Sequence, residues 1–190
     1  MIKTLRYSLL SLLVLVCGSV FAQKETLWAE NFSSYAANDV PAGGDYGYAC
    51  VGSGTKVYAE NLAGGESPEL LIGKSGGSFS VTIPMNGKSG EMTLRFKANR
   101  TLSVTSDDAT IGDKTNTGND YTIPVTVAEG TASVTLKFDN TSSKNIRFDN
   151  AELFIGESKK APGLSWGTAS YEVTIGSEDN TFPTLSNENN

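Results

Sequence analysis

The chain has 190 residues, a formal net charge of −6 and no histidine. An acidic chain without clusters of lysine and arginine is not expected to bind nucleic acid or anionic membrane surfaces. The absence of histidine removes the usual ligand of zinc and iron sites and the usual general base of serine and cysteine hydrolases.

Residues 1–22 predict a secretory signal peptide. Lys3 and Arg6 precede an apolar run at 9–16, and the segment ends in the small-residue cleavage pattern VFA. The apolar run is too short to span a bilayer, so we expect cleavage after Ala22, a secreted or cell-surface protein, and no membrane insertion afterwards. Cleavage removes two of the 15 basic residues, and the remaining 13 against 21 acidic residues give a formal charge of −8.

The same cleavage would remove Cys17 and leave Cys50 as the only cysteine. No intramolecular disulfide is then possible, so a hydrophobic core must stabilise the mature chain. A lone thiol in an exported protein is either a reactive group or a small buried hydrophobe, and we favour the second interpretation.

Short runs with alternating apolar residues predict β-strands along most of the mature chain. Their β-branched and aromatic residues recur with period two, and Gly, Asn, Asp and Ser clusters suited to turns lie between them. The clearest runs are 68–73, 77–84, 91–99, 101–105, 120–127 and 133–138. About eight strands at this spacing predict an all-β fold, a β-sandwich over residues 23–156.

The C-terminal part has a different composition. Residues 157–163 are rich in charge, Pro and Gly, as in a linker. Residues 164–190 contain apolar positions suited to opening strands, but so short a segment cannot bury a core of its own. We therefore expect either an incomplete domain, with the chain part of a longer multidomain protein, or a disordered C-terminus.

Two motifs that usually indicate catalysis or nucleotide binding are coincidental here. Residues 73–77, GKSGG, match the G-x-S-x-G pattern of hydrolases, but no histidine is present and strand follows strand rather than helix. The same residues suggest a phosphate-binding loop, but Pro68 stands in place of its first glycine.

Residues 113–118 faintly resemble a calcium loop, but Pro124 occupies the position of the bidentate Glu, and a hairpin turn is the favoured interpretation.

A glycoside hydrolase would need two carboxylates facing each other across a cleft. Candidates exist by residue type only, and acidic residues on loops are ordinarily solvated. They are Glu60, Glu66, Glu69, Asp107 and Asp108. We therefore expect no enzymatic activity, and a carboxylate-based hydrolase is the least favoured alternative.

A Tyr- and Gly-rich segment at 43–65 suggests a ligand site. Aromatic faces can stack on sugar rings, while neighbouring carboxylates and amides bind hydroxyl groups. The candidate ligand-binding residues are Tyr46, Tyr48, Tyr58, Asp45 and Asn61. The alternative is that one or two of the tyrosines simply close the edge of the sandwich.

Four stretches in this order carry a resemblance to a known kind of domain: WAENF, PELLIGKSGGSFSVTIP, GEMTLRFKAN and RFDNAELFIG. Together they resemble the jelly-roll sandwiches of galactose-binding-like and carbohydrate-binding modules in secreted bacterial multidomain proteins. The resemblance covers about residues 25–156, and the tail from Leu164 resembles the start of a bacterial immunoglobulin-like domain. It implies a non-catalytic module for carbohydrate binding or adhesion; the alternative is a structural spacer or stalk domain without a small ligand.

The resemblance also implies a metal site. In these families a structural calcium ion often ties the first strand to the last, and Glu30 and Asp149 are the matching acids here. This chain departs from the pattern in having Asn150 and Ala151 where a second Asp and a Val are frequent. The alternative is that Asp149 bonds to Arg147 or to backbone amides at a β-bulge, because the apolar alternation shifts there.

Overall fold

The computed structural model describes residues 24–156, and these contain twelve β-strands and no helix. The predicted signal peptide, the linker and the immunoglobulin-like segment lie outside the described residues. The strands are β1 (Glu25–Glu30), β2 (Ala49–Val51), β3 (Lys56–Tyr58), β4 (Glu69–Ile72), β5 (Ser78–Pro84), β6 (Gly90–Ala98), β7 (Ser103–Thr105), β8 (Ala109–Ile111), β9 (Thr115–Thr117), β10 (Asp120–Val127), β11 (Ser133–Asp139) and β12 (Ile146–Ile155).

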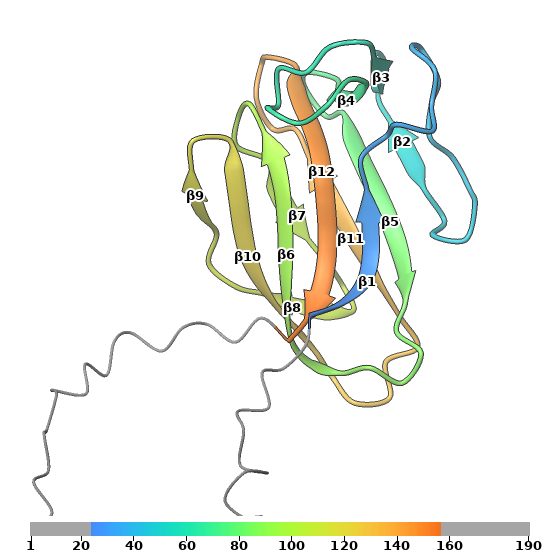
Figure 1. The fold of residues 1–190 in the computed structure, drawn as a ribbon, viewed down its shortest axis with the longest axis vertical. Coiled ribbons are helices and arrows are strands. Elements are labelled where there is room, and N and C mark those ends of the chain that lie inside the picture. Colours follow the sequence, from blue (N-terminus) through green and yellow to red (C-terminus); the bar gives the residue numbers. More distant parts are fainter. Residues whose placement is uncertain (1–23, 157–190) are drawn as a thin grey trace, which may run out of the picture. The chain divides into compact units, whose positions relative to one another are not determined.

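The strands form two antiparallel sheets, so the predicted all-β sandwich is confirmed (Figure 1). The first sheet has eight strands, in the order β3-β4-β12-β6-β10-β8, with β1 paired to β12 and β9 paired to β10. The second sheet has four strands, in the order β2-β5-β11-β7. From β4 to β8, and again from β10 to β12, each strand lies in the sheet opposite to the one before it.

The longer strands form where apolar residues alternate with polar ones. In β6 the buried positions are Met92, Leu94, Phe96 and Ala98, and the intervening residues are partly exposed. Fully burying each such side chain contributes about 1.5–3 kcal/mol of hydrophobic free energy. Four more strands are present than the predicted eight, because the three-residue strands β2, β3, β8 and β9 form outside the predicted runs.

An aromatic cluster joins the two sheets. Phe148 of β12 lies at its centre, and its ring centroid is 4.7 Å from that of Phe138 and 5.9 Å from that of Phe79 in the opposite sheet. Phe96 and Phe32 also pack against Phe148, at 5.4 Å and 6.1 Å. Because Phe148 points into this core, its strand neighbours Arg147 and Asp149 start from the outer face of the sheet.

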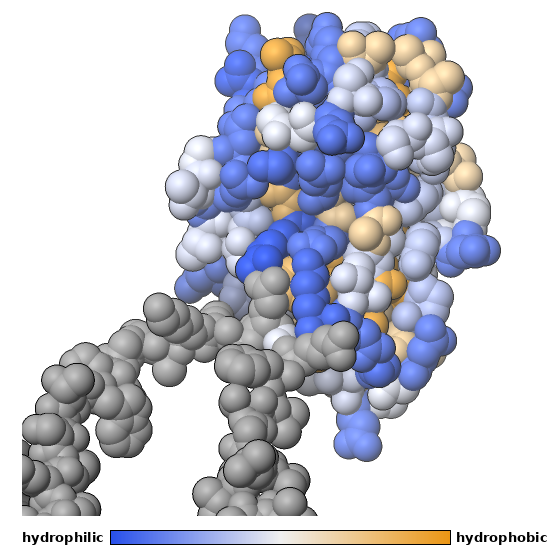
Figure 2. Space-filling view, viewed as in Figure 1, coloured by the Kyte–Doolittle hydropathy of each residue, from blue (hydrophilic) through white to orange (hydrophobic). Residues whose placement is uncertain are grey.

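The outer face of the eight-stranded sheet, which points away from the core, carries mostly polar side chains. Figure 2 shows it as largely hydrophilic, with a band of hydrophilic residues across its middle. Among the described residues no helix is long and apolar enough to cross a membrane.

Candidate functional site

Strand β12 changes its edge partner in the middle of its length. Its first residues pair with β4, with Phe148 opposite Leu70, and its last residues pair with β1, with Ala151 opposite Glu30. The register with β6 on its other side shifts between Asp149 and Glu152, which is the β-bulge that the shifted alternation suggested. Asn150 has φ of +46°, a left-handed conformation that Asn adopts more readily than most residues.

Asp149 is fully buried at this bulge. Neither of its carboxylate oxygens has a hydrogen-bond partner, so the predicted bond to Arg147 is absent. Burial raises the pKa of the carboxyl, and the backbone amides of Asn150 and Glu66 partly offset this rise, although neither makes a hydrogen bond of ordinary geometry. An unpartnered buried carboxylate costs several kcal/mol, so this residue needs a physical explanation.

A loop covers Asp149 on the outer face of the sheet. This covering loop, residues 59–68, connects β3 to β4 and passes so close that a Cβ on Gly65 would lie 1.7 Å from Asp149 Oδ2. Asn119 Nδ2 holds the loop in place by donating to the carbonyl oxygens of Leu62 and Ala63, at 3.3 and 3.0 Å. Glycine is therefore required at position 65 because of the close approach to the carboxylate.

Glu69 lies at the same place, as the first residue of β4. Its carboxylate is fully buried, and Oε2 accepts a hydrogen bond of 2.7 Å from the amide of Ala63. Oε1 has no hydrogen bond, and its nearest cation is Arg147 Nε at 3.6 Å. The expectation that Glu69 is a solvated loop residue is wrong, because the covering loop folds over it.

Arg147 is the cation that pairs with Glu69. Its guanidinium pairs with the exposed Glu60, stands 4.6 Å from the ring centroid of Tyr58, and leaves Nη1 without a partner. Burial, followed by the charge of Glu69 and then that of Glu30, raises the pKa of Asp149 to about 6. Negative charge is thus in excess beneath the covering loop.

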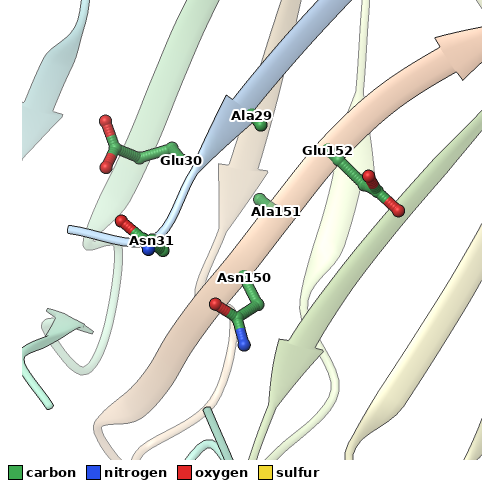
Figure 3. Close-up of a pocket in the computed structure, with 6 residues that line it drawn as sticks. All are labelled: Ala29, Glu30, Asn31, Asn150, Ala151 and Glu152. Carbon is green, nitrogen blue, oxygen red and sulfur yellow. The ribbon is translucent and has the colours of Figure 1, made fainter. Parts of the chain in front are cut away.

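Glu30, the other predicted metal ligand, lies at the end of β1. Its Oε1 accepts a hydrogen bond of 2.6 Å from the amide of Phe32, which has φ of +56° and turns the chain away after β1. In Figure 3 the Glu30 side chain extends away from β12, whereas Asn150 and Glu152 project from it. The effect of Glu30 on the pKa of Asp149 is smaller than that of Glu69.

A polar cavity lies beside the end of β1. It has a volume of about 440 Å³ and is lined by Ala29, Glu30, Asn31, Asn150, Ala151 and Glu152 (Figure 3). A second cavity of about 360 Å³ shares Asn150 and Glu152 and continues across β6 and β10. These surfaces offer amides and carboxylates to a ligand.

The donor set around Asp149 fits a hard cation only in part. Calcium prefers six to eight oxygen ligands from carboxylates and carbonyl groups. Asp149 has two buried, unused oxygens and Glu69 has one, whereas one oxygen of Glu30 is already bonded. No three His, Cys, Asp or Glu side chains within residues 24–156 gather closely enough to hold a metal by themselves, so backbone oxygens would have to complete any shell.

The tyrosine-rich segment begins with a tight hairpin at residues 43–48. Gly43 and Tyr48 exchange two backbone hydrogen bonds of 2.8 Å, and Gly47 N donates to Gly44 O at 3.1 Å. These three glycines have positive φ, between 50° and 72°. The carbonyl of Tyr46 accepts a bond of 2.7 Å from Thr82 N, so β5 of the four-stranded sheet holds the hairpin rigidly.

The hairpin brings Tyr46 and Tyr48 together, with ring centroids 6.1 Å apart. Tyr48 is the anchor, because its ring packs 5.5 Å from that of Phe79 and its hydroxyl accepts a bond of 3.0 Å from Trp28 Nε1. Burial and the nearby Glu30 raise the pKa of the Tyr48 hydroxyl. Tyr46 is also half-buried, and Asp45 beside it is exposed at the tip of the turn.

Tyr58 and Asn61 lie elsewhere in the fold. Tyr58 belongs to β3, at the edge of the eight-stranded sheet, where Arg147 and Lys56 stand over its ring. Asn61 is exposed in the covering loop, and its carbonyl accepts a bond from Gly64 N. The structure therefore brings together three of the five predicted ligand residues and places the other two on the opposite sheet.

The remaining hydrolase candidates lie on two separate parts of the chain. Glu66 is exposed in the covering loop, and Asp107 and Asp108 are exposed between β7 and β8. Asp108 accepts a bond of 3.1 Å from Thr135 N, and both aspartates line a cavity of about 260 Å³.

Glu69 and Gly65 were not predicted to lie next to Asp149. Only the pairing of β4 with β12 brings them together, and a single sequence contains no local signal for that pairing. Comparison with protein families, curated proteins and solved structures finds no match.

Proposed function

We propose that the chain is an exported, non-catalytic β-sandwich module that binds carbohydrate through the 43–48 hairpin. It would act as an accessory or adhesion part of a longer multidomain protein. The observation that supports this most is the hairpin itself, in which hydrogen bonds to its own backbone and to β5 fix a tyrosine pair beside an exposed carboxylate.

Sugar rings offer apolar C–H faces for stacking and hydroxyl groups for hydrogen bonding. The accessible part of the Tyr46 ring would take the first role and Asp45 the second, while Tyr48 positions Tyr46 from the core side. A rigid hairpin loses little conformational entropy on binding, and this favours affinity from few contacts. The polar cavity beside β1 offers hydrogen-bonding groups without an exposed ring, and for this reason we favour the hairpin.

A structural calcium ion at Asp149 is the second part of this proposal. Its support is the buried carboxylate whose two oxygens have no partner. The ion would stabilise the bulge of β12 and would take no part in contact with the sugar, because Asp149 is covered by the loop on the eight-stranded sheet.

Affinity electrophoresis of the mature chain in gels containing different polysaccharides tests the hairpin directly. We expect retardation by at least one polysaccharide, its loss in Tyr46→Ala, and its retention in Tyr46→Phe, which keeps the stacking ring. Tyr58→Ala is the matched control, because this tyrosine lies on the other sheet and should leave retardation unchanged. Equal retardation of the parent and Tyr46→Ala would contradict this placement of the site.

A further inference from the structure

We infer that Glu69, rather than Glu30, is the second carboxylate of a hard-cation site at Asp149, enclosed beneath the covering loop. This inference rests on the calcium part of the proposed function and is independent of sugar binding. It starts from three carboxylate oxygens that accept no hydrogen bond: both oxygens of Asp149, and Oε1 of Glu69, which has only the long ion pair with Arg147.

The register of the sheet explains why these two side chains meet. Leu70 pairs with Phe148 in antiparallel strands, so the residue before Leu70 faces the residue after Phe148. Both side chains start from the outer face, because Leu70 and Phe148 belong to the core. The covering loop then closes over the pair, with the Ala63 amide on Glu69 and Gly65 against Asp149.

The charges beneath the loop do not balance without a further positive group. The buried carboxylates of Glu69 and Asp149 lie there with the guanidinium of Arg147, which also pairs with the exposed Glu60. Glu69 and Asp149 alone exceed Arg147 by one charge in a site without solvent access, where an unbalanced charge is costly.

The chemistry of the donors selects the class of ion. All free donors are oxygen atoms, and hard cations such as calcium prefer oxygen. The absence of a side chain at Gly65 lets the backbone of the covering loop approach the carboxylate, and carbonyl groups of this loop would supply further oxygen ligands.

Glu30 is less suited to this role. Its Oε1 is engaged by the Phe32 amide, and its side chain extends away from β12 in Figure 3. In this assignment Glu30 stabilises the turn after β1 by accepting the hydrogen bond of the Phe32 amide, and its charge lies near the Tyr48 hydroxyl.

The consequence is that the cation would tie β12, β4 and the covering loop together. Because the two carboxylates are far apart in sequence, the ion would bind the native state and stabilise it by mass action. Removal of the ion should lower the melting temperature and loosen the covering loop without unfolding the core.

The test uses the mature chain, stripped with EDTA and then titrated with calcium chloride, with the melting temperature as the first readout. We expect calcium to raise the melting temperature of the parent, Glu69→Gln to lose most of this rise, and Glu30→Gln to keep it. Competition with a chromophoric calcium chelator gives the dissociation constant as a second readout, which should weaken in Glu69→Gln and not in Glu30→Gln.

Glu69→Asp keeps the charge if Glu69→Gln fails to fold, and its shorter side chain should also weaken calcium binding. A parent that does not respond to calcium would overturn the inference and indicate a buried water or a proton at Asp149. Loss of the response in Glu30→Gln together with its retention in Glu69→Gln would overturn the assignment of Glu69. Neither result would affect the electrophoresis with Tyr46→Ala, so failure of this inference and failure of sugar binding are distinguishable.

Discussion

Asp149 is an acidic residue in the middle of a strand whose other buried residues are apolar. A carboxylate in the middle of a buried strand costs free energy unless hydrogen bonds or a counter-charge compensate it. Here Arg147 is engaged by two glutamates, and both oxygens of Asp149 are left over. A buried acid of this kind often marks a binding role, and a bound cation is the compensation that we propose.

Gly65→Ala tests the close packing over this carboxylate. The added methyl group would overlap Asp149 Oδ2, so we expect a loss of about 1–3 kcal/mol in the free energy of unfolding. The measurement is chemical denaturation, and the control is the same substitution in an Asp149→Ala background, where the overlap with the carboxylate is removed and only the 2.9 Å approach to Asn150 Nδ2 remains. An equal cost in both backgrounds would show that the carboxylate is not the obstacle.

Cys50 provides a second prediction for a single residue. Burial raises the pKa of its thiol to about 11, from an ordinary value of 9.0. The thiolate is therefore about 100-fold scarcer at pH 8 in the folded chain than in the unfolded chain. We expect iodoacetamide to alkylate the native protein much more slowly than the urea-unfolded protein. Equal rates would show that the partial burial of Cys50 does not protect its thiol.

At the scale of elements, the bulge in β12 lets this strand pair first with β4 and then with β1. The bulge also directs Asp149 under the covering loop. Its geometry depends on the left-handed conformation of Asn150, which costs most residues about 1–2 kcal/mol.

Substitutions at Asn150 should therefore follow backbone preference rather than side-chain size. We expect Asn150→Gly to leave the free energy of unfolding nearly unchanged and Asn150→Val to lower it by about 1–2 kcal/mol. Denaturation midpoints of the two variants measure this difference. A parent-like Asn150→Val would mean that the bulge does not require positive φ.

The sequence predicted the elements better than their partners. Alternation placed β5, β6, β10 and β11 within about a residue of their ends, because period two reports directly on burial of one face. The three-residue strands β2 and β3 were missed, since so short a run carries no period. The partnership of Glu69 with Asp149 could not be predicted, because it depends on strand pairing between distant segments.

The candidate ligand residues divide in the same way. Tyr46, Tyr48 and Asp45 come together because a hairpin of six residues is local, and glycines with positive φ close it. Tyr58 and Asn61 follow within about 15 residues in sequence but lie on the other sheet, because the chain crosses the sandwich between β2 and β3.

At the scale of the whole molecule, the two sheets enclose a core of aromatic and aliphatic side chains. If the signal peptide is cleaved as predicted, Cys50 is the only cysteine left, and this core must stabilise the chain without an intramolecular disulfide. The hairpin and the covering loop belong to different sheets, so a sugar site and a cation site could be lost separately.

The predicted export has a direct test in the intact protein. Mass spectrometry of secreted material should give a chain that begins at Gln23, because residues 20–22 form the cleavage pattern. A secreted product that retains Cys17, with or without a lipid, would contradict the predicted cleavage site.

We propose that the hairpin makes this sandwich a carbohydrate-binding module, and a glycan array probed with the mature chain can test this proposal. The parent and Tyr46→Ala are applied side by side, at equal concentration and with calcium present. We predict binding of the parent to at least one class of glycan and loss of that binding in Tyr46→Ala. A parent that binds no glycan at any concentration tested would contradict the claim and favour a structural spacer domain.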